Sequence, residues 1–355
     1  MKHITISAPG KLYLLGEHGV VYGKPALLAT VNKRCTVNIT PRQDKKIEII
    51  SQDLKQSVVC SYKDIVETTD QAQRQWDMYR KTKDIKLLQA ITKEPLAYAM
   101  ICVGEALMAC DTKNTSGMTI EIRSEIPVGS GMGSSAALAV AIAGAVCVCF
   151  KKTLDTTLIN TCAFRAEQKM HGTPSGGDNT ASCYGGLLWY SKESEEVKNI
   201  QHLSFGVPRE FAQYMYAIDT GQPEESTGEM VDAVRHLYTK NHTLVDSILT
   251  SQEALTRGLF HAIQIVDEKA FVQSIQKGEE NLEKLGVVSL FTKEIIREIE
   301  RQGGAAKVCG AGGTKNRSGI VLAYCKDEQV IADICLSKNI VYYPITLSDE
   351  GVREA

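Results

Sequence analysis

Residues 127–137 read PVGSGMGSSAA, a glycine-rich turn that leads directly into an apolar run. Glycines let the backbone N–H groups of a turn approach a ligand closely, because no side chain stands in the way. The first turn of a following helix adds unpaired N–H groups and a partial positive charge of about +0.5. Residues 136–150 carry no charge, so we expect a helix that is buried on all sides and holds the turn rigid. The stretch predicts an anion site, suited to phosphate, at the start of a core helix.

The same turn has a plainer interpretation that its residues leave open. It matches neither the GxxxxGK[ST] phosphate loop nor the GxGxxG dinucleotide turn. A simple strand-to-helix connection with Ser134 as the N-cap would explain the same residues. Ser134 and Ser135 could also reach a metal ion bound to phosphate. Further motifs are needed to decide.

The composition of the 355 residues is that of a globular protein. Hydrophobic residues make up 43%, charged residues 23%, and the formal net charge is −2. A protein with this charge balance has no strongly positive electrostatic potential that would attract nucleic acid or an anionic membrane, so we expect neither as a partner. The run at 136–150 is too short to span a bilayer, and the N-terminus lacks the apolar core of a signal peptide. Eleven cysteines without a CxxC pair indicate reduced thiols and a cytoplasmic protein.

Periodicity predicts a mixture of strands and helices. Strands are predicted at 3–8, 12–15, 29–40, 47–50, 118–123, 214–218, 307–308, 319–324 and 340–345. Helices are predicted at 87–108, 134–150, 154–170 and within 223–302. A Pro-Gly turn is expected to separate the first two strands. The charged segment 52–85 has little periodicity and is expected to be a partly helical surface excursion. The pattern changes near residue 195, where we expect a domain boundary.

Three further stretches combine glycines with chemically active side chains. Residues 8–23, APGKLYLLGEHGVVYG, include Lys11, Glu17 and His18. Residues 171–179, HGTPSGGDN, include Asp178, and Glu167 lies one helical turn upstream; residues 307–314 read KVCGAGGT. A carboxylate in a tight loop can accept a proton, and one on a rigid helix can bind magnesium. Surface positions, helix caps and plain turns explain each stretch as well, so the spacing alone does not decide.

In order and in register, these motifs resemble those of the GHMP small-molecule kinases. The stretch at 8–23 is similar to the first family motif, PVGSGMGSSAA to the nucleotide-binding motif, and HGTPSGGDN to the HGxPSGxDN signature. The similarity is greatest to the branch that acts on mevalonate. It implies phosphorylation of the 5-hydroxyl of mevalonate by ATP with Mg²⁺.

The resemblance also implies the architecture. We expect an α+β, two-domain GHMP kinase fold. Residues 1–195 would form an N-terminal ATP-binding domain with a left-handed βαβ unit, and residues 196–355 a C-terminal, ferredoxin-like domain. ATP and the acceptor would lie in the cleft between them. Members of the family are often dimers, so a homodimer is a further expectation.

Each motif residue takes an implied role. Asp178 would act on the acceptor hydroxyl as base or aligning group together with Lys11, which would also offset charge on the phosphoryl group. Ser135 and Glu167 would hold the magnesium ion. The residues implied in acceptor binding are Glu17, His18, Thr227, Gly310 and Ala311. The residues implied in ATP binding are Ser124, Gly129, Ser130, Gly131, Met132, Gly133, Ser134 and Ser135.

The chain departs from the family pattern at two places. The third motif usually continues as a run of small residues, whereas here residues 310–319 read GAGGTKNRSG. The inserted part, residues 314–318, is called the divergent loop below. Gly177 replaces the usual apolar residue before Asp178, which would leave the backbone there freer.

Two alternatives stay open. The chain could be a kinase for another acceptor, phosphomevalonate above all, or a metabolite sensor that has kept the fold and lost catalysis. A phosphorylated acceptor would need extra cations near Glu17, His18 and Thr227, and the local sequence supplies few. The presence of the catalytic residue types argues against a sensor.

Overall fold

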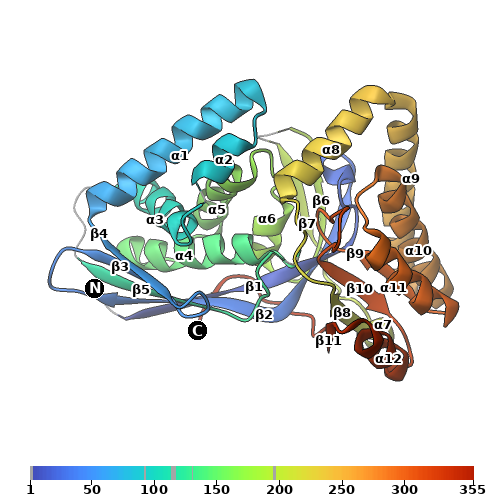
Figure 1. The fold of residues 1–355 in the computed structure, drawn as a ribbon. Coiled ribbons are helices and arrows are strands. Elements are labelled where there is room, and N and C mark those ends of the chain that lie inside the picture. Colours follow the sequence, from blue (N-terminus) through green and yellow to red (C-terminus); the bar gives the residue numbers. More distant parts are fainter. Residues whose placement is uncertain (1–2, 92, 113–116, 130, 195–196) are drawn as a thin grey trace.

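A computed structural model describes residues 3–91, 93–112, 117–129, 131–194 and 197–355. In this part of the chain the strands form an eight-stranded and a four-stranded sheet. Helices α1 to α6 cover one face of the larger sheet, and α10, α11 and α12 pack against the smaller one (Figure 1). The α+β class expected from the sequence is confirmed.

The larger sheet has the strand order β12-β1-β2-β5-β3-β4, and β6 extends it by pairing with both β2 and β7. Its strands are β1 (Ile4–Leu15), β2 (Ala26–Pro41), β3 (Ile47–Ser51), β4 (Gln56–Cys60), β5 (Met118–Ser124), β6 (Leu187–Lys192), β7 (Lys198–His202) and β12 (Arg353–Glu354). The smaller sheet has the order β11-β8-β10-β9 and is antiparallel throughout. Its strands are β8 (Met215–Asp219), β9 (Ala305–Val308), β10 (Ile320–Tyr324) and β11 (Val341–Pro344).

The helices in the first half of the chain are α1 (Tyr62–Thr82), α2 (Lys86–Ile91), α3 (Ala97–Ala109), α4 (Ser134–Lys151), α5 (Thr156–His171) and α6 (Gly177–Tyr184). The later helices are α7 (Arg209–Ala212), α8 (Thr227–Lys240), α9 (His242–Ile265), α10 (Glu268–Leu285), α11 (Leu290–Arg301) and α12 (Glu328–Lys338). Strands β7 and β12 belong to the larger sheet although they follow residue 195. The proposed division of the chain near residue 195 stays a prediction.

The expected Pro-Gly turn near the N-terminus is wrong. Strand β1 continues through it, and its pairing with β2 shifts register between Pro9 and Gly10. A bulge of this kind bends a strand without ending it and re-aims the side chains beyond it. The two extra residues, Asn32 and Lys33, belong to β2, and Lys11 of β1 follows the shift and donates its backbone N–H to the carbonyl of Met132 at 2.9 Å. The irregularity therefore joins β1 to the glycine-rich turn.

Helix α4 is the buried helix that the opening stretch predicts. It packs on β1 and β2 and between α3 and α5, and its side chains from Ala136 to Cys147 are almost all buried. By length and composition α4 could cross a membrane, but 61% of it is buried within the protein, as in a core helix.

Two expected helical segments differ from the structure. The single helix expected over 87–108 is divided into α2 and α3, and Pro95 lies between them, where proline disfavours a continuous helix. The charged segment 52–85 contains α1, a helix of 21 residues. Ser61 and Asp64 form a capping box at its start, a sequence signal that could have placed it.

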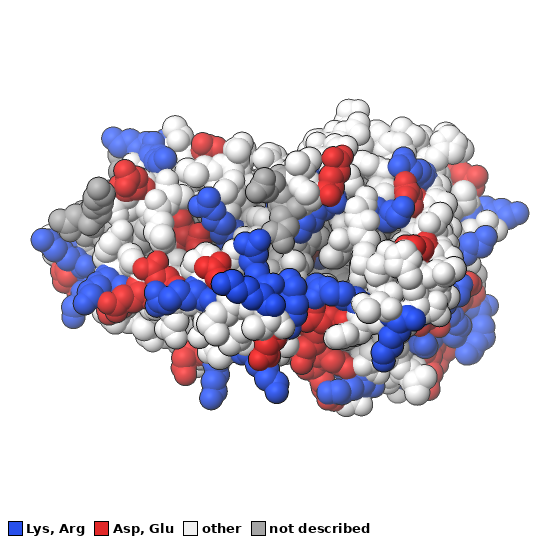
Figure 2. Space-filling model, turned by 90° about the horizontal axis from the view of Figure 1, so that it is seen from above, with Lys and Arg blue, Asp and Glu red and all other residues white. Residues whose placement is uncertain are grey.

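Charges of both signs are spread over the outside of the molecule. On the face in Figure 2, lysines and arginines form a band across the middle that is bordered by acidic side chains. This mixture accords with the net charge of −2.

The contact between α1 and α3 depends on a glycine. A Cβ added at Gly104 would lie 1.9 Å from Oγ1 of Thr69, a buried residue of α1. We expect Gly104→Ala to lower the free energy of unfolding by about 1–3 kcal/mol, the usual cost of overpacking. Urea denaturation would measure the change. Gly258→Ala in α9 is the matched control, since its Cβ would meet only Ser274 Oγ at 3.7 Å, and we expect no loss there. Equal stability of Gly104→Ala and the wild type would contradict the packing described.

Candidate active site

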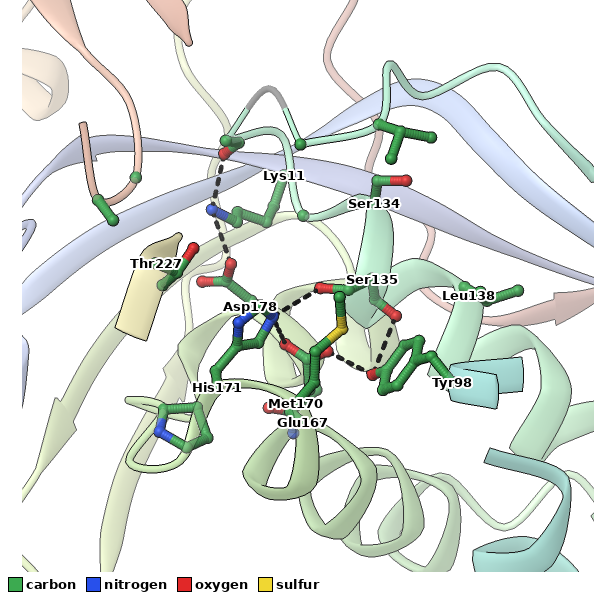
Figure 3. Close-up of a pocket in the computed structure, with 18 of the residues that line it drawn as sticks. Lys11, Tyr98, Ser134, Ser135, Leu138, Glu167, Met170, His171, Asp178 and Thr227 are labelled. Atoms are coloured by element: carbon green, nitrogen blue, oxygen red, sulfur yellow. Dashed lines mark hydrogen bonds and ion pairs between the residues drawn. The ribbon is translucent and has the colours of Figure 1, made fainter. Parts of the chain in front are cut away.

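A cavity of about 390 Å³ lies between the larger sheet, α4, α5 and the first residues of α8. Its lining includes, from the predicted site, Lys11, Glu17, His18, Ser124, Gly129, Gly131, Gly133, Ser134, Ser135, Glu167, Asp178, Thr227, Gly310 and Ala311. Segments far apart in the sequence therefore meet at one place (Figure 3). Met132 does not line the cavity, because its side chain is buried in the core. Ser130 lies outside the described residues.

The turn before α4 has a backbone that requires glycine. Gly129, Gly131 and Gly133 have φ angles of 70°, 91° and 73°, a region that other residues rarely adopt. A Cβ at Gly131 would also lie 2.4 Å from the carbonyl oxygen of Cys309. The N-cap of α4 is Gly133, which makes no side-chain capping bond, so the interpretation of Ser134 as N-cap is wrong. The unpaired N–H groups of the first helical turn remain available to an anion.

Lys11 and Asp178 form an ion pair in the cavity. The distance from Lys11 Nζ to Asp178 Oδ2 is 2.9 Å, and Nζ also donates to the carbonyl of Gly131 at 3.0 Å. The Lys11 side chain is 1% exposed and that of Asp178 is 32% exposed. One lysine therefore links the strand β1, the glycine-rich turn and the start of α6, while the carboxylate keeps one side open to the cavity.

Gly177 fits its place for a steric reason. It is buried at the first position of α6, and a Cβ there would lie 2.9 Å from the hydroxyl of Tyr13. That hydroxyl is 3.1 Å from Ser175 Oγ. The absent side chain thus makes room for Tyr13 behind the loop that presents Asp178.

Ser135, Glu167, His171 and Tyr98 form a second cluster in the cavity (Figure 3). His171 Nε2 is 3.2 Å from Ser135 Oγ and 3.7 Å from Glu167 Oε2. Tyr98 OH donates to Glu167 Oε1 at 2.5 Å. Glu167, at 3% exposed, is thus buried but partnered. His171 and Tyr98 received no role from the sequence: His171 lies within a recognised motif, whereas nothing in the sequence places Tyr98 of α3 here.

The oxygen atoms of this cluster suit a magnesium ion. Mg²⁺ prefers hard oxygen ligands, takes few of them from protein and completes its shell with water and substrate phosphates. A serine hydroxyl and a glutamate carboxylate on adjacent helices supply that kind of set. In the described residues, no group of three or more histidine, cysteine or acidic side chains could hold a metal alone. This limited donor set fits an ion that arrives with a nucleotide.

The opposite wall of the cavity carries a buried ion pair. Lys307 Nζ donates to Glu17 Oε1 and to the carbonyl of Tyr13, and both charged side chains are at most 1% exposed. Next to it, His18 Nε2 is 3.1 Å from the carbonyl of Ala311. Lys307, which had no predicted role, therefore fixes Glu17 in place.

Other lining residues were also missed by sequence reasoning. Asp53 Oδ2 accepts a hydrogen bond from the backbone N–H of Ser124 at 2.7 Å. The remaining ones on this side are mostly apolar: Leu54, Pro95, Leu96, Val128 and Leu138. Val128 and Leu138 lie in or beside the glycine-rich motif, whereas Leu54, Pro95 and Leu96 belong to segments without a motif and are brought here only by the fold.

Known proteins resemble this chain over most of its length. The family model of the GHMP kinases N terminal domain matches residues 97–186. The mevalonate kinase of Schizosaccharomyces pombe is 26% identical and covers 99% of this chain and 91% of its own. That of Pyrococcus horikoshii is 32% identical, with 88% and 87% covered. The crystal structure of the Methanococcus jannaschii mevalonate kinase covers 98% of both chains with a TM-score of 0.74 and 21% identity, which indicates the same fold.

The burial of His18 predicts a pH dependence of stability. Burial lowers the pKa of His18 to about 4 from its ordinary value of 6.5, although its hydrogen bond to Ala311 opposes the shift. Between pH 6.5 and about pH 4 the unfolded chain therefore binds a proton at His18 that the folded chain does not bind. The free energy of unfolding falls as the pH falls through this range. We expect His18→Gln to remove about 2 kcal/mol of the difference in unfolding free energy between pH 7 and pH 5.

Urea denaturation of both proteins at the two pH values measures this effect. Burial raises the pKa of Glu279 to about 8, so that group changes stability in the opposite sense. It is present in both proteins, and the difference between them isolates His18. An identical pH dependence of the two proteins would show that His18 is not buried in its neutral form.

Proposed function

This chain belongs to the mevalonate kinase family of the GHMP kinases, and from this premise we propose that it transfers the terminal phosphoryl group of ATP to the 5-hydroxyl of mevalonate. The observation that carries the proposal is the ion pair of Lys11 and Asp178 beside the glycine-rich turn. This pair places a carboxylate and a cation between the proposed phosphate site at the start of α4 and the opposite wall of the cavity, where we propose that the alcohol binds.

The phosphates of ATP bind at the start of α4 in this proposal. The backbone N–H groups of the glycine-rich turn and of the first turn of α4 attract the negative charge of the phosphates. Ser134 and Ser135 add hydroxyl donors. Leu54, Leu96 and Val128 offer apolar surface for the rest of the nucleotide.

Ser135 and Glu167 would hold Mg²⁺ together with the nucleotide. When bound, the ion neutralises phosphate charge that would otherwise oppose transfer. His171 and Tyr98 orient the two protein oxygens through the contacts described above.

Asp178 aligns the acceptor hydroxyl and takes its proton as the oxygen bonds to phosphorus. A positioned base of this kind contributes roughly 10²- to 10⁴-fold. Lys11 orients Asp178 by the ion pair and lies close enough to the glycine-rich turn to offset charge on the phosphoryl group.

The charges of the cavity favour mevalonate over phosphomevalonate. Among the described lining residues, Lys11 is the only lysine or arginine. Lys307 lies behind the wall, where it is bound to Glu17. An acceptor that already carries a phosphate would find no second free cation there. Glu17, His18, Thr227, Gly310 and Ala311 form the acceptor wall. The homodimer remains a prediction from the family resemblance, and the cytoplasmic location remains a prediction from the cysteines.

The acceptor and the role of Asp178 are tested in one assay. The purified protein is mixed with Mg-ATP and either mevalonate, phosphomevalonate or galactose, and ADP release is followed. We expect turnover with mevalonate and formation of 5-phosphomevalonate. Asp178→Asn keeps the shape of the side chain but removes the base, so its turnover should fall roughly 10²- to 10⁴-fold.

Binding of a non-hydrolysable ATP analogue to Asp178→Asn is the control, and it should be retained. Wild-type turnover in this variant would exclude Asp178 as the base. Preferred turnover of phosphomevalonate would replace the proposed acceptor.

A further inference from the structure

The divergent loop is fastened to the segment that joins β8 to α8. Thr314 Oγ1 donates to Glu225 Oε1 at 2.5 Å, and Asn316 Nδ2 donates to Glu224 Oε1 at 2.5 Å. These bonds connect the loop to residues 221–226, which lead into the cavity. Glu224 and Glu225 are therefore hydrogen-bonded to the loop, close to the cavity in which we propose that the phosphates bind.

The other end of the segment is held as well. The guanidinium of Arg317 lies 3.9 Å from the ring centroid of Phe291. Gly221 packs against the Arg317 side chain, since an added Cβ would lie 3.3 Å from its Cγ. Thr220 Oγ1 donates to the carbonyl of Gly319 at 2.7 Å. The segment is therefore anchored on both sides of residue 222.

Gln222 extends from this anchored segment to the glycine-rich turn. It lines the cavity, and a Cβ added at Gly129 would lie 2.9 Å from Nε2 and 3.0 Å from Cδ of Gln222. Its amide thus packs on the backbone of Gly129. A side chain from the second half of the chain reaches the seat described for the phosphates.

We propose that the side chain of Gln222 binds the nucleotide phosphates from the part of the cavity wall that faces the start of α4, and that the divergent loop holds this side chain in position. The proposal rests on the function proposed above. An amide N–H is a suitable donor to a phosphate oxygen. Gln222 itself is exposed, so ordering it would weaken binding unless its segment were fixed beforehand. Thr314 and Asn316 provide that fixation through Glu225 and Glu224.

Nucleotide binding without an acceptor tests the proposal. Titration calorimetry with Mg²⁺ and a non-hydrolysable ATP analogue measures the Kd. We expect Gln222→Ala to raise Kd roughly tenfold, as for the loss of one hydrogen bond to a charged group. Gln213→Ala is the matched control, because Gln213 is an exposed glutamine at the opposite end of β8. Its Kd should equal that of the wild type.

The role of the divergent loop is tested at Thr314. Thr314→Val keeps the shape but removes the donor to Glu225, and we expect Kd to rise about threefold or more. Thr314→Ser keeps the donor and should restore binding. In a Gln222→Ala background, Thr314→Val should add no further loss, because both act through the same side chain. In turnover, the KM for ATP should rise while kcat at saturating ATP stays near its wild-type value.

The outcomes separate this proposal from the proposed function. Wild-type affinity in Gln222→Ala overturns it, and an equal effect of Thr314→Val with and without Gln222 overturns the positioning role of the loop. A protein that loses affinity as expected but transfers nothing to mevalonate contradicts the proposed function and leaves the inference standing. A wild type that binds no nucleotide contradicts both.

Discussion

The burial of the Lys11 ammonium is the constraint on which the site depends. A buried cation is tolerated only when oxygen atoms surround it, because the loss of hydration must be offset. Asp178 and the carbonyl of Gly131 provide those atoms, and the backbone N–H of Lys11 binds Met132. The strand β1, the glycine-rich turn and α6 must therefore meet at one point. The shift in register between β1 and β2 comes directly before this lysine, and its extra residues lie in β2.

The two halves of the chain meet in the same place. Gly131 and Gly310 lie backbone to backbone, and a Cβ at Gly310 would lie 3.2 Å from the Cα of Gly131. Beneath them, Lys307 of β9 is bound to Glu17 near the end of β1. The proposed nucleotide seat and acceptor wall are thus fixed relative to each other by glycine contacts and a buried charge pair. Gln222, in the second half of the chain, crosses the same junction and packs on Gly129.

Local motifs predicted the chemistry of the site, but not its supporting contacts. Glycine-bracketed polar residues in apolar sequence identified the parts of the chain that line the cavity, and an uncharged run predicted the core helix. Tyr98 and Gln222 could not be found in this way, and neither could the pairing of Lys307 with Glu17, because each acts on a partner far away in the sequence. The break at Pro95 and the capping box at Ser61 were readable local signals. The continuous strand β1 was not, since only its pairing with β2 shows that the strand runs on through the Pro-Gly pair.

The coupling between Lys11 and Asp178 is the direct test of this account. Single-turnover rates of Lys11→Met, Asp178→Asn and the double variant, with Mg-ATP and mevalonate, give their interaction free energy. If the two side chains act as one unit, the double variant should be no slower than the slower single variant. Losses that multiply in the double variant would mean that the two residues act independently, and would contradict the role assigned to the ion pair.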